Sequence, residues 1–279
     1  MNIAIASGKG GTGKTSLAVN LAAVAERPVR LLDCDVEEPD AHIFLRGERG
    51  TTRAVAVPVP VIDTALCNGC RRCARFCAFH ALVSFGAAPL FFPDLCHGCG
   101  GCVRVCRRKA IREGERRIGT VEISRAGPVT LVEGRLDVGI AAAAPLVRAV
   151  KKEAAGDLTI CDAPPGTSCS TVAALDGSDY VVLVAEPTRF GLNDLTLAVE
   201  TVRRMGLSFG TVVNRAVAGM TLVRDYCRSE GIEVLGEIPD DRKIAEAYSE
   251  GRIAAEALPQ YREVFRGLLR SILSKKAAA

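Results

Sequence analysis

The sequence predicts a three-layer α/β fold with a mostly parallel sheet, interrupted by a small inserted α+β domain. Apolar strand-like runs alternate with helical runs at both ends of the chain, a pattern typical of parallel sheets covered on both faces. The alternation stops near Thr51 and resumes near Thr120. Eight of the twelve cysteines fall inside this gap, between Cys67 and Cys106, which marks the gap as a separate unit.

The elements before the gap are expected to be a strand, a glycine-rich loop, a helix and a second strand. Residues 2–6 form a short apolar run and residues 8–13 contain four glycines. Residues 15–26 have apolar positions at helical spacing, and residues 29–32 form another buried run. After the gap, strands are expected over 158–161, 180–185, 211–213 and 233–238, with helices over 192–205 and 222–229.

The gap itself shows no long helix or strand pattern. We therefore expect residues 1–55 and 120–279 to form one discontinuous domain, and residues 56–119 to form the inserted one. Charge separates the two parts as well. Residues 64–119 carry ten Lys/Arg and three Asp/Glu, a net charge of +7, which leaves −3 for the rest of the chain.

Composition narrows the class of protein. The chain has 279 residues, of which 48% are hydrophobic and 24% charged, which excludes intrinsic disorder. A net charge of only +4 argues against a general nucleic-acid binder. No run of about 18 apolar residues predicts a transmembrane helix, and the N-terminus lacks the pattern of a secretory signal. We expect a cytoplasmic protein whose cysteines stay reduced for metal binding or chemistry.

A glycine-rich loop follows the first predicted strand and opens the first predicted helix. It reads G-x4-G-K-T from Gly8 to Thr15. Glycines let backbone N–H groups turn inward, and the helix N-terminus adds positive potential, so the loop suits the β- and γ-phosphates of a nucleotide. Lys14 would reach phosphate oxygens and Thr15 would bind Mg²⁺. The candidate nucleotide-binding residues here are Gly8, Gly10, Gly11, Thr12, Gly13, Lys14, Thr15 and Ser16.

The second lysine of this loop, Lys9, distinguishes it from a plain phosphate loop. The string from Lys9 to Thr15 resembles the deviant Walker A motif of the MinD superfamily (SIMIBI class) of P-loop ATPases, which includes MinD, ParA, Mrp and the nitrogenase iron protein. The resemblance implies a P-loop NTPase fold, MgATP as cofactor, and an ATP-sandwich dimer in which Lys9 reaches the partner's nucleotide. Lys9, Lys14 and Asp35 are then the candidate catalytic residues.

Three further motifs agree with this resemblance. Asp33 and Asp35 follow the second strand, where the family's aspartates support Mg²⁺ and orient the attacking water, respectively. Asp162 ends an apolar strand before Pro-Pro-Gly and would hold Mg²⁺ through water. The third motif, Asn214-Arg215, resembles the family's adenine-reading segment, since an amide offers a donor and an acceptor to a purine. Pro239 matches the loop that closes over the base.

Two cysteine blocks have the same spacing, Cys-x2-Cys-x2-Cys-x3-Cys. Thiolates at this spacing bind cubane iron–sulfur clusters, and in two-cluster ferredoxins the fourth Cys of each block ligates the other cluster. The alternative is zinc, whose sites pair two C-x2-C units across a longer gap. The expected metal-ligating sets are Cys67, Cys70, Cys73 and Cys106 for one [4Fe–4S] cluster, and Cys77, Cys96, Cys99 and Cys102 for the other.

The insert therefore resembles a bacterial 2[4Fe–4S] ferredoxin domain. It departs from that pattern where proline normally follows the fourth Cys, because Ala78 and Arg107 stand there. The basic excess would offset the negative charge of the clusters and dock an acidic redox partner. We expect five phenylalanines to form the core of the insert; these are Phe76, Phe79, Phe85, Phe91 and Phe92.

The combined pattern predicts an ATP-dependent iron–sulfur protein that couples changes in a dimer to electron transfer. The dimer is expected to be a homodimer or a heterodimer with a similar chain. Two alternatives remain: an iron–sulfur carrier or assembly ATPase of the Mrp type, and a MinD-like positioning ATPase with structural or sensory clusters. Cys169 is a candidate ligand of an interface cluster, but we expect an ordinary thiol there. The C-terminal apolar stripe, which includes Phe265 and Leu268, is expected to pack on the core rather than bind a membrane.

Overall fold

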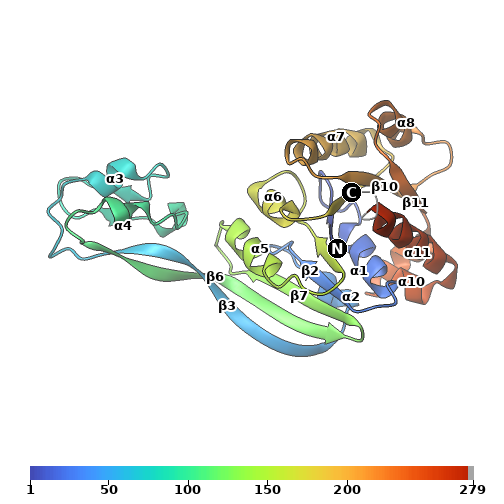
Figure 1. Cartoon of the computed structure of the whole chain (residues 1–279), viewed down its shortest axis with the longest axis horizontal. Helices are drawn as coiled ribbons and strands as arrows, with labels where there is room; N and C mark the ends of the chain where they lie inside the picture. Colours follow the sequence, from blue (N-terminus) through green and yellow to red (C-terminus); the bar gives the residue numbers. More distant parts are fainter. Residues whose placement is uncertain (276–279) are drawn as a thin grey trace.

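The structure, a computed structural model, describes residues 1–275 and contains a nine-stranded sheet (Figure 1). The strand order is β11-β10-β9-β1-β8-β2-β7-β6-β3, and a separate two-stranded sheet contains β4 and β5. The strands of the large sheet are β1 (Asn2–Ala6), β2 (Val29–Asp33), β3 (Glu48–Ile62), β6 (Ile111–Ala126), β7 (Val129–Leu136), β8 (Thr159–Asp162), β9 (Tyr180–Ala185), β10 (Phe209–Ala216) and β11 (Val234–Pro239). All pairs from β11 to β7 are parallel, while β6 pairs antiparallel with both β7 and β3.

Helices cover both faces of the parallel part of the sheet. One face packs against α1 (Lys14–Ala23), α2 (Ala41–Phe44), α10 (Ala254–Ala257) and α11 (Pro259–Ser274). The other packs against α5 (Ala143–Lys151), α6 (Cys169–Leu175), α7 (Arg189–Arg204) and α8 (Leu222–Ser229). The remaining helix of the body, α9 (Arg242–Ser249), follows β11. The predicted three-layer α/β fold with a mostly parallel sheet is confirmed.

The C-terminal helix α11 shows why its stripe is apolar. Phe265, Leu268, Leu269 and Ile272 recur at helical spacing and are at most 4% exposed, because they pack on the sheet beside α1. The stripe therefore belongs to the core, as expected. Within residues 1–275, none of the helices combines the length and apolar character needed to cross a bilayer.

Two long strands, β3 and β6, correct the expectation that residues 51–120 lack such elements. They pair antiparallel from Glu48–Arg125 to Ile62–Ile111 and form an arm that leaves the body (Figure 1). The strand pattern was obscured by prolines: valine alternates with Ala54, Ala56, Pro58 and Pro60. Proline is tolerated because β3 is the edge strand and pairs on one side only.

The distal end of the arm carries a small module of short elements (Figure 1). These are α3 (Arg72–Phe76), β4 (Leu82–Val83), β5 (Leu90–Phe91), the 3₁₀ turn η1 (Pro93–Leu95) and α4 (Gly101–Val105). Both expected domain boundaries, 55/56 and 119/120, fall inside a strand of this arm. The division of the chain into a body and an inserted domain at these positions stays a prediction. We call residues 63–110 the cysteine module.

Candidate nucleotide site and thiol sites

The glycine-rich loop joins β1 to α1 at the carboxyl end of the parallel strands. Ser7 Oγ donates to the Lys9 carbonyl at 2.6 Å, and Asn214 Nδ2 donates to the Thr12 carbonyl at 2.7 Å. Gly13, with φ at 91°, caps α1 in the left-handed region that glycine favours. Space is short at Gly8, where an added Cβ would lie 2.1 Å from the Asp194 carbonyl oxygen. The loop is thus held in place from β10 and α7.

Thr15 and Asp162 meet at the start of α1 and the end of β8. Thr15 Oγ1 donates to Asp162 Oδ2 at 2.5 Å, while Asp162 Oδ1 is buried without a hydrogen-bond partner among the described residues. Burial raises the pKa of Asp162 to about 7, although the Thr15 hydroxyl and the Lys14 charge oppose the rise. An unpartnered carboxylate oxygen beside a hydroxyl is the donor set that Mg²⁺ prefers, directly or through water.

Asp33 and Asp35 lie close to this carboxylate and differ in their surroundings. Asp33 is fully buried, and its two oxygens accept backbone N–H bonds of 3.1 Å from Asp35, Asp40 and Ala41. Burial, followed by repulsion from Asp162, raises the pKa of Asp33. Burial also raises the pKa of Asp35 to about 6, against the opposing charge of Lys14. Asp33 therefore holds the loop that carries Asp35.

Lys9 makes an ion pair within its own chain. Its Nζ lies 3.2 Å from Glu186 Oε2, and Arg215 Nη1 lies 2.8 Å from Glu186 Oε1. Through these two ion pairs the Glu186 carboxylate joins the phosphate loop to the end of β10. Its side chain is only 12% exposed. The sequence did not indicate Glu186, because a lone acidic residue after a strand has no distinguishing spacing.

A cavity with about 640 Å³ of empty space, part of it open to solvent, lies beside the phosphate loop. It brings together five of the predicted residues: Gly13, Ser16, Asn214, Arg215 and Pro239. Sequence reasoning missed Ile244, Ala245 and Tyr248 of α9, which also line it. Their i, i+1 and i+4 spacing places them on one face of a helix. Residues that pack on a protein core have the same spacing, so the pattern could not identify them as lining a cavity.

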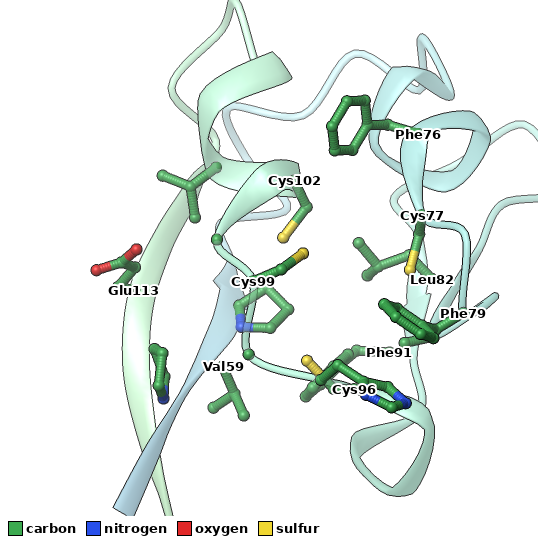
Figure 2. Close-up of a pocket in the computed structure, with 17 residues that line it drawn as sticks. Val59, Phe76, Cys77, Phe79, Leu82, Phe91, Cys96, Cys99, Cys102 and Glu113 are labelled. Carbon is green, nitrogen blue, oxygen red and sulfur yellow. The ribbon is translucent and has the colours of Figure 1, made fainter. Parts of the chain in front are cut away.

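The eight clustered cysteines line two hollows in the cysteine module. Site A contains Cys67, Cys70, Cys73 and Cys106, which line about 360 Å³ of empty space, part of it open to solvent. Site B contains Cys77, Cys96, Cys99 and Cys102, with about 470 Å³. Figure 2 shows the four sulfur atoms of site B turned toward one hollow. Each site thus takes three thiols from one block and the fourth from the other, in the predicted arrangement.

An internal two-fold relation connects the sites. Moving one residue of a pair forward by 29 positions and its partner back by 29 maps Leu82–Phe91, a pair in β4 and β5, onto Ile111–Ile62 in the arm. The same shift maps the hydrogen bond from Phe92 N to Ala81 O onto the one from Asp63 N to Ala110 O, both 2.8 Å long. Positive φ angles repeat as well, in the pairs Gly69 and Gly98, Arg71 and Gly100, and His80 and Lys109.

The thiols of the two sites have similar electrostatics. Burial raises the pKa of Cys73 in site A and of Cys102 in site B, and neighbouring thiols of the same site raise it further. Thiols packed this closely lose protons readily only when a bound cation compensates their charge. Among the described residues, no group of three or more His, Cys, Asp or Glu converges on a point suited to a single metal ion.

The expected phenylalanine core of the module is wrong for four of its five residues, since Phe91 alone of the five packs against the buried cluster. Phe76, Phe79, Phe85 and Phe92 are all at least 44% exposed. The buried core consists instead of Cys73, Leu82 and Ile111, because the module is too small to enclose more than the residues between its two short hairpins. Phe79 stacks on His97 with ring centroids 3.7 Å apart, at the edge of site B.

The four other cysteines lie in the body. Cys34, Cys161 and Cys227 are buried as small apolar residues, and the Cys34 and Cys161 sulfur atoms are 3.4 Å apart. Cys169 is exposed at the start of α6. None of these four lines either thiol site.

Comparison with known proteins assigns most of the chain to a family. Residues 3–254 match the CobQ/CobB/MinD/ParA nucleotide binding domain. The chain belongs to this family. Its P-loop fold and phosphate-loop motif follow from that membership.

Two relatives of this CobQ/CobB/MinD/ParA family protein come from Methanocaldococcus jannaschii. The uncharacterized protein MJ0579 is 29% identical over 259 residues, covering 90% of each chain. The uncharacterized protein MJ0578 is 32% identical over 221 residues, covering 77% of this chain and 78% of the relative.

Solved structures share the fold. The septum site-determining protein MinD of Pyrococcus horikoshii, complexed with Mg-ADP, has a TM-score of 0.60 at 19% identity, with 96% of this chain and 93% of that chain covered. The ATP complex of a Cyanothece McdA variant has a TM-score of 0.60 at 17% identity, with 97% of this chain and 95% of that chain covered.

Proposed function

We propose that this protein is an ATP-binding and ATP-hydrolysing iron–sulfur protein, in which nucleotide-driven changes of a dimer gate electron transfer through two [4Fe–4S] clusters. The observation that carries the proposal is the pair of four-thiol hollows on an arm whose strand β6 pairs with β7 of the nucleotide-binding sheet. The cysteine module and the nucleotide-binding sheet are joined through continuous strands, which would carry a change at one to the other.

The nucleotide half of the proposal rests on atoms around the phosphate loop. The loop amides and Lys14 would hold the phosphates, and Thr15 with Asp162 Oδ1, which has no hydrogen-bond partner in the described chain, would support Mg²⁺. Asp35, on the loop organised by Asp33, would orient the attacking water. Asn214, Arg215 and Pro239 would receive the adenine in the adjoining cavity. The Mg-ADP bound by the Pyrococcus MinD and the ATP bound by McdA support the same ligand here.

The cluster half rests on the donor set. Four thiols and no carboxylate ligand line site A, and three of them come from a single C-x2-C-x2-C segment. Such a segment would supply one thiolate to each of three irons of a cubane, and the Cys from the other block would supply the fourth, so the sulfurs need not converge on one point. Site B repeats this arrangement. The residues present therefore fit two [4Fe–4S] clusters, which would supply one-electron chemistry when bound.

A dimer supports the proposed gating. Lys9 is paired with Glu186 in this chain, so reaching a partner's nucleotide requires that ion pair to break. Ordering of two nucleotides between two chains would supply the energy. A similar chain would serve as partner equally well, and Methanocaldococcus jannaschii has two relatives of this protein. The redox partner of the module would be a protein with an acidic surface.

Anaerobic kinetics test the function. Reduced protein is mixed with candidate one-electron acceptors with and without MgATP, and compared with Asp35→Ala, which removes the water-orienting carboxylate. MgATP is expected to change the rate for the wild type only. An equal effect of MgATP on the electron-transfer rates of the two proteins would contradict the gating proposal. Iron and sulfide analysis beforehand is expected to give about eight irons per chain.

A second candidate, a MinD-like positioning ATPase, is favoured by the structural likeness to MinD. Its membrane attachment would have to come from another surface than α11, whose apolar stripe is buried. Sedimentation with anionic liposomes separates the two candidates: ATP-dependent binding supports positioning, and its absence supports the redox function. The Mrp-type carrier is tested by incubation with an apo-ferredoxin, to which a carrier transfers iron rapidly.

A further inference from the structure

The two thiol sites have the same backbone and different side chains. The 29-residue shift that superimposes their cysteines also pairs Arg71 with Gly100 and Arg72 with Gly101. It further pairs Arg108 with Phe79 and Ser84 with Glu113. All of these residues except Gly101 line the sites. Equivalent positions around equivalent thiols therefore carry different charges.

Site A has a positive lining. Arg71, Arg72 and Arg108 line it, and no carboxylate does. In the part of the chain that the structure describes, these three arginines make no ion pair with Asp or Glu, so their charge is not neutralised locally. Arg71 and Arg108 are exposed; Arg71 lies within the first cysteine block and Arg108 just after the second.

Site B has the opposite character. Its lining contains one carboxylate, that of Glu113, and no Lys or Arg. An added Cβ on Gly100 would lie 3.0 Å from Glu113 Oε1, which places this carboxylate beside the loop between Cys99 and Cys102. Phe76, Phe79 and Phe91 make the rest of the lining apolar (Figure 2).

Charge of this kind sets a redox equilibrium. Reduction of a thiolate-ligated cluster adds one negative charge, so nearby cations favour the reduced state, whereas a carboxylate and an apolar surrounding disfavour it. We propose that the two sites differ in reduction potential, with site A the higher, and that Arg71, Arg108 and Glu113 set the difference. The inference rests on the proposed function, because it requires both sites to hold clusters. A single electron on the module then resides mainly at site A.

The test is an EPR-monitored redox titration of the full-length protein, purified anaerobically. Wild type is expected to reduce in two one-electron steps separated by at least about tenfold in equilibrium constant, equal to about 59 mV. Arg71→Gln combined with Arg108→Gln is expected to lower the higher step by about that amount and leave the lower one in place. Glu113→Gln is expected to raise the lower step alone. Arg242→Gln, an exposed charge change on α9, is the matched control and should move neither step.

The outcomes separate this inference from the function on which it rests. Absence of iron in the wild-type protein would overturn both. Two outcomes would overturn the inference and leave the two-cluster function standing. One is about eight irons per chain with both reduction steps at the same potential; the other is that the arginine double variant and Glu113→Gln shift the same step. Iron content and thermal unfolding of each variant are measured first, so that a lost cluster is not mistaken for a shifted potential.

Discussion

Asp162 Oδ2 accepts a 2.5 Å hydrogen bond from Thr15 Oγ1, while Oδ1 of the same carboxylate is buried without a hydrogen-bond partner in the described chain. The two oxygens of this carboxylate therefore differ, since only Oδ2 is hydrogen-bonded within the described chain. Burying a charge without full compensation is costly, and this is why the pKa of Asp162 lies at about 7.

The stability of the metal-free protein is expected to fall as pH rises from about 4 to about 7. The pKa of Asp162 is raised in the folded state, so the folded protein binds more protons than the unfolded chain in this window. Asp35, with its pKa at about 6, adds to the trend. Urea unfolding in EDTA across this range measures it. Asp162→Asn should reduce the slope, and an unchanged slope would contradict the assignment.

Gly8→Ala is expected to destabilise the protein by about 1–3 kcal/mol, because the added methyl group meets the backbone carbonyl of Asp194 at 2.1 Å. Gly10→Ala is the matched control. Its added Cβ has nothing within 4 Å and its φ is not positive, so a change within about 0.5 kcal/mol is expected. Chemical denaturation of both variants without nucleotide decides; equal losses would mean that the loop is not clamped by α7.

Asn214→Ala is expected to weaken nucleotide binding by roughly tenfold. The substitution removes the 2.7 Å bond that holds Thr12 in the phosphate loop and an amide that lines the cavity beside this loop. Titration with a fluorescent ATP analogue measures the change. Gln260→Ala, which removes an exposed amide from α11, should bind like the wild type. Identical affinities for all three proteins would place the base elsewhere.

Cys70→Ala and Cys99→Ala are each expected to lower the iron content from about eight to about four per chain. The two cysteines occupy equivalent places in sites A and B, and both are exposed, so their loss should leave the fold intact. Cys169→Ala, an exposed thiol outside both sites, should retain all the iron. Anaerobic iron and sulfide analysis is the measurement, and equal iron in all three variants would reject the two ligand sets.

Lys9→Ala is expected to abolish ATP-dependent dimerisation while changing the stability of the single chain by less than about 1 kcal/mol. The ion pair with Glu186 is 3.2 Å long and its lysine is 36% exposed, which keeps its contribution small. Light scattering with a non-hydrolysable ATP analogue reports the dimer, and urea unfolding reports the chain. A variant that still dimerises would show that Lys9 acts within its own chain.

Local patterns were sufficient wherever one segment builds one feature. The phosphate loop, the strand ending at Asp162 and the alternation of strands and helices were predicted, because hydrophobic periodicity and glycine spacing report the local backbone directly. The repeated cysteine spacing also predicted which thiols share a hollow. The long strands β3 and β6 were missed. The prolines of β3 are tolerated only at a sheet edge, which a single sequence does not reveal, and the many charges of β6 obscure its strand pattern.

The amino-acid sequence alone thus predicted a three-layer α/β fold, its phosphate loop and two sets of four thiols. Each of these follows from the spacing of apolar residues, glycines or cysteines along the chain. Folding in three dimensions set the rest. It pairs Glu186 with Lys9 and leaves one oxygen of Asp162 without a hydrogen-bond partner among residues 1–275. It also places α9 beside the cavity next to the phosphate loop, and puts arginines around site A where site B has Glu113. These relationships join residues far apart in the chain, and their energies depend on distance and burial, which no local pattern records.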